Sequence, residues 1–110
     1  PLLYEIGRTE SIRSLGLRYR DMEVNDRVMM PVLHMEARYL APIKYDDNLT
    51  IRTIIKELPT KMIKFDHEIY NEELELCHRA YVKLFFVDMD TNKRVTTPIA
   101  LQQALKSYYE

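Results

Sequence analysis

The sequence is poor in the residues that mark flexible, membrane-spanning or disulfide-bonded chains. Glycine occurs twice and proline five times in 110 residues, which argues against a linker, a collagen-like chain or a disordered tail. No apolar run approaches the roughly 20 residues that a membrane-spanning helix needs, and no secretory signal opens the chain. The one cysteine, Cys77, can form neither an internal disulfide nor a cysteine-rich zinc site, so we expect a reducing, cytoplasmic location.

A strong charge of either sign is also missing. Sixteen basic and seventeen acidic residues leave a net charge of −1, so we expect no general nucleic-acid binding, although a local basic patch is still compatible with this balance. Hydrophobic residues make up 46% of the chain, and a chain of this length can bury about two-thirds of its surface. These values predict a single domain with one core.

Apolar residues at helical spacing predict a helix over residues 1–15, which ends at Gly16. Gly7 lies inside this helix, where glycine costs about 1 kcal/mol relative to alanine. A tolerated defect would explain it, but we favour the close approach of a strand to the helix backbone. Residues 17–27 are polar and charged, and predict a solvated connection with a short helical turn.

Alternating apolar and polar residues predict four strands, and a short helix follows Pro98. The expected ranges are 33–39, 49–57, 63–69 and 76–87 for the strands and 99–108 for the helix. In the first strand we expect Leu33, Met35, Ala37 and Tyr39 to form a buried face. The turns are short, which predicts that strands consecutive in the sequence are antiparallel neighbours. The expected fold class is therefore α+β, an antiparallel sheet wrapped around a central helix, and the first helix is the only sizeable apolar one available to cover it.

Three segments resemble a known family: YEIGRTE at 4–10, LGL at 15–17 and RYLAPIKYDDNL at 38–49. Together they resemble the hotdog-fold acyl-CoA thioesterases, in particular the hydroxybenzoyl-CoA thioesterase family with its Tol-Pal-associated bacterial members. The similarity runs from residue 1 to about Pro98. The resemblance implies hydrolysis of fatty or aromatic acyl-CoA thioesters, without a metal or organic cofactor.

The resemblance also implies a catalytic aspartate in the loop before the central helix, about ten residues upstream of Pro1. That residue and the family's first strand lie outside residues 1–110. The chain opens at Pro1, without a methionine, in sequence that is already helix-like, so we expect it to belong to a longer protein. We therefore expect residues 1–110 to form a single hotdog domain lacking this strand and loop, and to be nearly inactive alone.

Within the chain, Glu5 is the acid nearest to the expected site, at the start of the helix. Unpaired N–H groups and the partial positive charge at a helix N-terminus can stabilise the oxyanion of thioester hydrolysis. Glu5 could support the main carboxylate or orient a water molecule. The simpler interpretation, which we favour, is an acid stabilised by the helix dipole and paired with Arg8.

Four basic residues are candidates for binding the phosphates of coenzyme A: Lys61, Lys64, Lys93 and Arg94. Charge-assisted hydrogen bonds from lysine and arginine are the usual means of holding phosphate. For each residue, ordinary solvated charge is the more common explanation. No further cofactor-binding residue is expected.

The remaining polar residues give little sign of catalysis. His34, His67 and His78 show neither metal-ligand spacing nor the order of a catalytic triad, so no metal site is expected. Cys77 and His78 are adjacent in a strand and should point to opposite faces. The pair at residues 46–47, two aspartates, is explained by turn chemistry.

Two functions other than thioester hydrolysis are compatible with a hotdog fold, and the sheet surface also predicts the assembly state. A non-catalytic hotdog module that binds an acyl ligand or a protein partner is the main alternative. An acyl dehydratase would need a histidine on or near the first helix, and residues 1–15 contain none. Because Tyr81 and Phe85 lie on the outward face of the sheet, where wet aromatic rings are costly, we expect a homo-oligomer, either a dimer or a tetramer.

Overall fold

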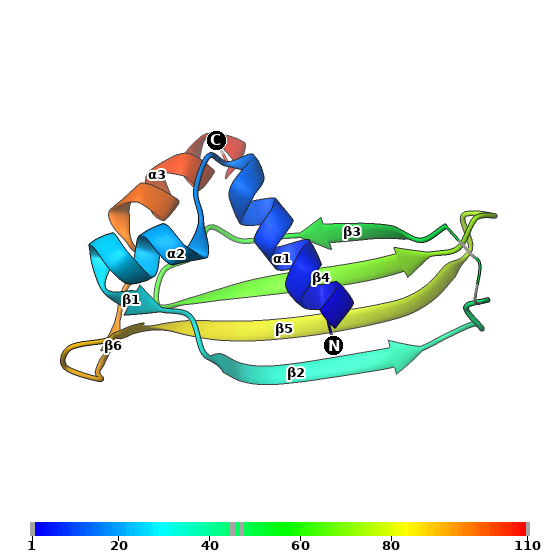
Figure 1. The fold of residues 1–110 in the computed structure, drawn as a ribbon, viewed down its shortest axis with the longest axis horizontal. Coiled ribbons are helices and arrows are strands. Elements are labelled where there is room, and N and C mark those ends of the chain that lie inside the picture. Colours follow the sequence, from blue (N-terminus) through cyan, green and yellow to red (C-terminus); the bar gives the residue numbers. More distant parts are fainter. Residues whose placement is uncertain (1, 45, 47, 110) are drawn as a thin grey trace.

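The computed structural model describes residues 2–44, 46 and 48–109. One long helix lies across one face of a curled sheet, and a shorter C-terminal helix covers one end (Figure 1). In chain order the elements are α1 (Leu2–Ser14), α2 (Tyr19–Asp21), a π-helical turn (Met22–Asp26), β1 (Val28–Met29), β2 (Val32–Tyr39), β3 (Thr50–Ile54), β4 (Met62–Tyr70), β5 (Leu76–Asp88), β6 (Arg94–Val95), α3 (Ile99–Lys106) and a 3-10 turn (Ser107–Tyr109). The predicted α+β class, an antiparallel sheet with a helix packed on it, is confirmed.

The long strands lie in the order β2-β5-β4-β3, and every pairing is antiparallel. The short strands β1 and β6 both pair with the end of β5. The prediction that consecutive strands are neighbours is wrong for β2 and β3, which lie at opposite edges of the sheet. Residues 40–49 join them, and the amides of Leu40 and Ala41 donate to the Cys77 carbonyl at 2.9 and 3.1 Å, which directs this segment past the end of β5.

Alternation along β4 and β5 produces the core, as predicted. Ile63, Phe65, His67 and Ile69 of β4 are buried, and so are Ala80, Val82, Leu84 and Phe86 of β5. The intervening residues face away from α1. Two adjacent strands with the same period thus give the sheet one apolar face, on which the helices lie.

The predicted buried face of β2 is wrong, because all eight of its residues are exposed. Met35 is 37% exposed and Tyr39 is 66% exposed. The reason lies in the position of the helix. α1 packs on β3 and β4, whereas β2 is an edge strand beyond β5 and receives little cover from α1.

Helix α1 contacts the sheet through residues one turn apart, at Tyr4, Arg8 and Ile12, all of which are buried. Ile6, one of the apolar residues at helical spacing in this segment, is 44% exposed. Gly7 is buried at a close contact: an added Cβ atom would lie 2.7 Å from Thr53 Oγ1 on β3. The predicted close approach at Gly7 is confirmed. Gly16 ends the helical segment with φ at +82°, as a C-terminal glycine should.

The C-terminal helix α3 covers the other end of the apolar face. Leu101 and Leu105 pack in one cluster with Ile12, Phe65 and Phe86. The expectation that only the first helix covers the sheet is therefore wrong. The polar segment 17–27 is mostly exposed as predicted, except that Met22 of the π-helical turn is 3% exposed and joins the same cluster. No helix in the described part of the chain is both long and apolar enough to cross a membrane.

Candidate functional site

The N-terminal end of α1 rests on a stack of polar aromatic rings. Tyr4, 1% exposed, lies between His67 of β4 and His78 of β5, with ring centroids 5.1 and 5.5 Å away. The Tyr4 hydroxyl is hydrogen-bonded to Nδ1 of His78. The edge of Tyr39, from β2, contacts His78 at 6.1 Å between centroids. Three strands therefore contribute one aromatic side chain each to the region beneath the first turns of α1.

His67 is the deepest polar group of this region. Its Nδ1 lies 3.1 Å from Thr53 Oγ1, and its Nε2 has no hydrogen-bond partner among the described residues. Burial lowers the pKa of His67 to about 4, and the positive charge of Arg8 lowers it further, while Asp66 acts in the opposite direction. His67 is therefore neutral near pH 7.

Arg8 is a buried cation beneath the centre of α1, with 9% of its surface exposed. Its charge partly offsets the effect of burial on Tyr19, whose pKa is nevertheless raised to about 12. The expected pairing of Arg8 with Glu5 does not form. Glu5 is exposed, and the ion pair at i,i+3 spacing on α1 joins Arg13 to Glu10 at 3.6 Å.

Glu5 lies in the first turn of α1, where it is the one acidic residue. That placement agrees with the sequence-based expectation, and its carboxylate is free to contact solvent or a ligand. The described structure brings no second acid to this turn.

The four basic candidates lie at the far end of the sheet from Tyr4. Lys64 faces away from α1, and its ammonium group is 3.8 Å from a Glu57 carboxylate oxygen. The Arg94 guanidinium stacks on the Phe85 ring at 4.3 Å from its centroid. Lys61 lies in the turn before β4, and Lys93 lies in the β5–β6 hairpin. Lys64 and Arg94 therefore lie on the sheet face opposite to α1, whereas Lys61 and Lys93 lie in the turns at this end of the sheet.

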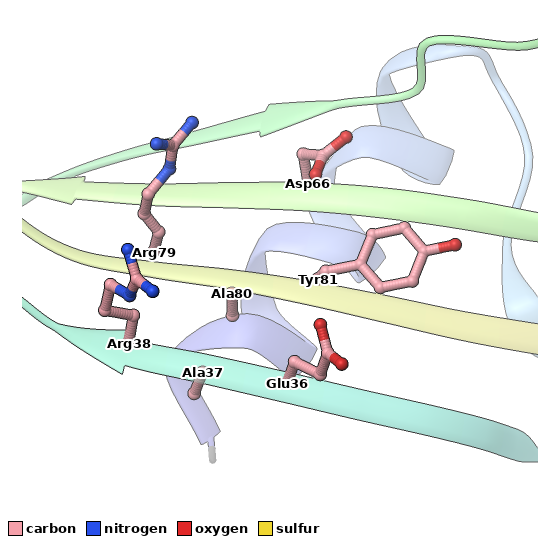
Figure 2. A pocket seen from close by; sticks show the side chains of 7 residues that line it. All are labelled: Glu36, Ala37, Arg38, Asp66, Arg79, Ala80 and Tyr81. Atoms are coloured by element: carbon pink, nitrogen blue, oxygen red, sulfur yellow. The ribbon is translucent and has the colours of Figure 1, made fainter.

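A shallow hollow of about 560 Å³ lies on that same outer face (Figure 2). Two rows of side chains cross it, one with basic residues and one with acidic residues. In one row Arg38 of β2 is directly opposite Arg79 of β5, and in the next Glu36, Tyr81 and Asp66 are in register. Arg79 has one distant acid partner, Glu68, at 4.0 Å. Figure 2 shows these side chains projecting from the sheet on the side away from α1.

The residues for which the sequence predicts no catalytic or metal-binding role lie in turns or make contacts within the fold. His34 pairs with Glu36 at 3.0 Å on the outer face, and the Cys77 thiol contacts the carbonyls of Pro42 and Glu75. Asp46 is in an exposed turn, and Asp47 is outside the described residues. Among the described residues, no group of three or more metal-ligating side chains comes together.

The aromatic stack at Tyr4 does not follow from the sequence motifs. Tyr4 is part of the segment that resembles the thioesterases, and neither His67 nor His78 has a spacing that links it to Tyr4. The spacing of Tyr4, Arg8 and Ile12 at i, i+4 and i+8 could have shown which face of the helix meets the sheet. The pairing of β4 with β5, which joins His67 to His78 through Tyr4, depends on the register and could not be derived from spacing alone.

Comparison with known proteins agrees with this geometry. A model of the family described as the Thioesterase-like superfamily matches residues 2–105. YneP of Bacillus subtilis (strain 168), provisionally named an acyl-CoA thioesterase, is 30% identical over 105 residues, which cover 96% of this chain and 72% of YneP.

Two solved structures share the fold at lower identity. Slr0204, a 1,4-dihydroxy-2-naphthoyl-CoA thioesterase from Synechocystis, superposes with a TM-score of 0.87 at 18% identity, covering 99% of this chain and 80% of its own. A 4-hydroxybenzoyl CoA thioesterase, solved with 4-hydroxybenzoyl CoA, superposes with a TM-score of 0.80 at 22% identity over 94% of this chain and 78% of its own. With its helix packed on the curled antiparallel sheet, the chain belongs to the acyl-CoA thioesterases of the Thioesterase-like superfamily and has their hotdog fold.

Proposed function

We propose that the protein hydrolyses the thioester bond of an aromatic acyl-CoA. The observation that carries this proposal is the position of the N-terminal turn of α1, which lies beside the rings of Tyr4, His78 and Tyr39. Helix N–H groups there can polarise a thioester carbonyl, and the adjacent rings suit a planar acyl group. The solved neighbours named for naphthoyl and hydroxybenzoyl substrates support the aromatic preference.

The chemistry requires an oxyanion site, a water molecule and a carboxylate. Water attacks the carbonyl carbon, its proton passes to the carboxylate, and the carbon–sulfur bond breaks to release coenzyme A as a thiol and the acyl group as a carboxylic acid. In our proposal the start of α1 stabilises the oxyanion. Glu5 has a supporting role, and the main carboxylate comes from outside residues 1–110.

Hydrolysis is tested by following thiol release with a chromogenic reagent over a panel of short, long and aromatic acyl-CoAs. We expect the full-length protein to hydrolyse at least one aromatic acyl-CoA. Residues 1–110 alone should be slower by roughly 10²–10⁴-fold, the typical cost of losing a general base. A full-length protein that binds acyl-CoA but releases no thiol would instead support the non-catalytic binding module.

We further propose that Lys61, Lys64, Lys93 and Arg94 bind the phosphates of coenzyme A. Reversing all four charges should raise KM by roughly 10²–10³-fold, since each contact contributes about 1 kcal/mol, or about fivefold, and added salt should weaken binding in the unmodified protein. The matched control reverses four exposed cations on or beside the helical segments, namely Arg13, Arg18, Arg20 and Lys106. Unchanged affinity in the fourfold variant would place the phosphates elsewhere.

The outer sheet face supports a homo-oligomer in our proposal. Tyr81 and Phe85 are half-buried there, and the row of Arg38 and Arg79 lies beside the row of Glu36 and Asp66. A patch whose two halves carry opposite charge can contact a second copy of itself across a twofold axis. Light scattering at micromolar concentration should give a multiple of the 13.2 kDa chain mass for residues 1–110. A stable single-chain mass would contradict this assembly.

A cytoplasmic location is part of the proposal, since the buried Cys77 thiol is free.

A further inference from the structure

The hollow on the outer face of the sheet contains two arginines at directly opposite positions of neighbouring strands. Arg38 of β2 is in register with Arg79 of β5, and both side chains project from the sheet on the side away from α1 (Figure 2). Like charges directly opposite each other on adjacent strands are destabilising. An anion bound between the two guanidinium groups would remove this cost.

The nearest carboxylates of this face do not neutralise the arginine pair. Among the described residues Arg38 has no acid partner, and Arg79 has only Glu68, at 4.0 Å. Glu68 is bound more closely by Arg52, at 3.2 Å, and it also accepts a hydrogen bond from the Tyr70 hydroxyl at 3.0 Å. Its single charge is therefore shared between two arginines, and most of the charge of the Arg38–Arg79 pair is uncompensated.

The acids of the neighbouring row have basic partners of their own. Glu36 lies 3.0 Å from His34 Nε2. Asp66 lies 3.7 Å from the Lys56 ammonium group. Half-buried Tyr81 is in register between the two acids and borders the hollow. This row supplies oxygen atoms that can accept hydrogen bonds from a ligand, and its negative charge disfavours an extended polyanion such as nucleic acid.

From this charge pattern we propose that the outer hollow is a second ligand site, for a small phosphate monoester that carries hydroxyl groups. Such an ester has a charge of about −1.5 to −2 at pH 7, which matches two guanidinium groups, and its oxygens suit their planar forks. Residues two apart on a strand are separated by about 6.7 Å, so hydroxyl groups at that distance from the phosphorus reach Glu36 and Tyr81. The volume of about 560 Å³ is in the range of small-molecule sites.

This site is separate from the start of α1, but it overlaps the surface proposed for a second copy. The helix lies on the other face of the sheet, so the phosphate ester and a thioester do not share these residues. In the proposed assembly the acidic row of a second copy approaches the arginine pair. The ester and the second copy therefore compete, and the ester should lower the average mass that light scattering measures. A mass that stays constant at saturating ester would reject this competition.

Calorimetric titration of the full-length protein with ribose 5-phosphate tests the site, with inorganic phosphate and ribose as comparisons. We expect saturable binding of the ester, several-fold weaker binding of inorganic phosphate, and none of ribose. Arg79→Ala should weaken binding roughly tenfold or more, because it removes a charge-assisted contact. Arg38→Lys, which keeps the charge and loses the fork, should weaken it several-fold. Arg13→Ala, at an exposed arginine on α1, is the matched control and should bind normally.

Stability without ligand separates a folding defect from a binding defect. Removing one of two opposed like charges should not lower the thermal unfolding midpoint of ligand-free Arg79→Ala. Ribose 5-phosphate should raise the midpoint of the unmodified protein and leave that of Arg79→Ala nearly unchanged, because a ligand stabilises only the protein that binds it.

Three results would overturn the proposal. One is the absence of saturable binding of ribose 5-phosphate. Another is equal affinity in Arg79→Ala and the unmodified protein, which would leave only non-specific attraction. The third is an affinity for coenzyme A that falls in Arg79→Ala as much as the affinity for ribose 5-phosphate, since the arginine pair would then belong to the substrate site. None of these measurements depends on turnover, so a failure of the proposed hydrolysis is distinguished from a failure of this site.

Discussion

The free energy of unfolding should fall by roughly 3 kcal/mol as the pH is lowered from about 6.5 to about 4, through the protonation of His67. In the unfolded chain this histidine takes up a proton near pH 6.5, whereas in the folded protein it resists protonation until about pH 4. Between these values the unfolded state binds more protons, so acid favours unfolding. Well above pH 6.5 both states are neutral at this residue, and the effect vanishes.

The size of this effect follows from where His67 lies. The side chain is fully buried between Phe65 and Tyr4, and its Nδ1 contacts the Thr53 hydroxyl. A charged imidazole there would lose its hydration and face the buried charge of Arg8, while Asp66 compensates only in part.

Urea unfolding of the protein at a series of pH values measures the slope. His67→Asn keeps a group able to bond Thr53 but cannot be protonated, so its stability should be nearly constant between pH 6.5 and 4, although lower at neutral pH. The control is His34→Gln, an exposed histidine on β2, which should retain the full acid loss. Asp88, whose pKa is lowered by hydrogen bonds from the Thr91 and Asp90 amides, also loses its contribution towards the acid end of this range, but it does so equally in all three proteins and cancels in their comparison. A His67→Asn variant as acid-sensitive as the unmodified protein would contradict the prediction.

The predictions from the sequence are most accurate for elements whose apolar residues follow a single helical or strand period. The first helix, the strands at β4 and β5, and the C-terminal helix after Pro98 all lie close to their expected ranges, because their apolar spacing agrees with local propensity. For β2 the predicted strand is correct, but the predicted burial of one of its faces is wrong. Alternation shows that a strand has two faces, but the position of the covering helix decides whether either is buried.

The site was harder to foresee because it depends on register. Glu5 was placed correctly at the start of the helix, but its expected partner Arg8 turned inward to the sheet. Tyr4 and His78 are 74 residues apart and meet only because β5 is paired with β4 and lies under α1. The sequence context of each histidine, taken separately, does not show that His67 and His78 both stack on the Tyr4 ring.

Gly7→Ala should destabilise the protein by up to about 2 kcal/mol, although alanine is the better helix former. The added methyl group would lie 2.7 Å from Thr53 Oγ1, a distance that requires movement of one element. Thr53 cannot rotate freely, because its hydroxyl contacts His67 Nδ1 at 3.1 Å. Overpacking of this kind costs about 1–3 kcal/mol, which exceeds the gain of about 1 kcal/mol from replacing a helical glycine. Thermal and urea unfolding measure the difference.

A double-mutant cycle shows whether Thr53 is the cause. Thr53→Ala alone should lose some stability, because it removes the partner of His67. In that background, however, Gly7→Ala should become neutral or stabilising, since the nearest remaining atoms, in His67 and Ile51, are 3.4 Å from the new methyl group. Gly16→Ala is the matched control: its cost arises from φ at +82° with no atom within 4 Å, so Thr53→Ala should not change it. If the cost of Gly7→Ala is the same in both backgrounds, the helix approaches the sheet less closely at this point than the structure indicates, and Gly7 is only a tolerated defect in α1.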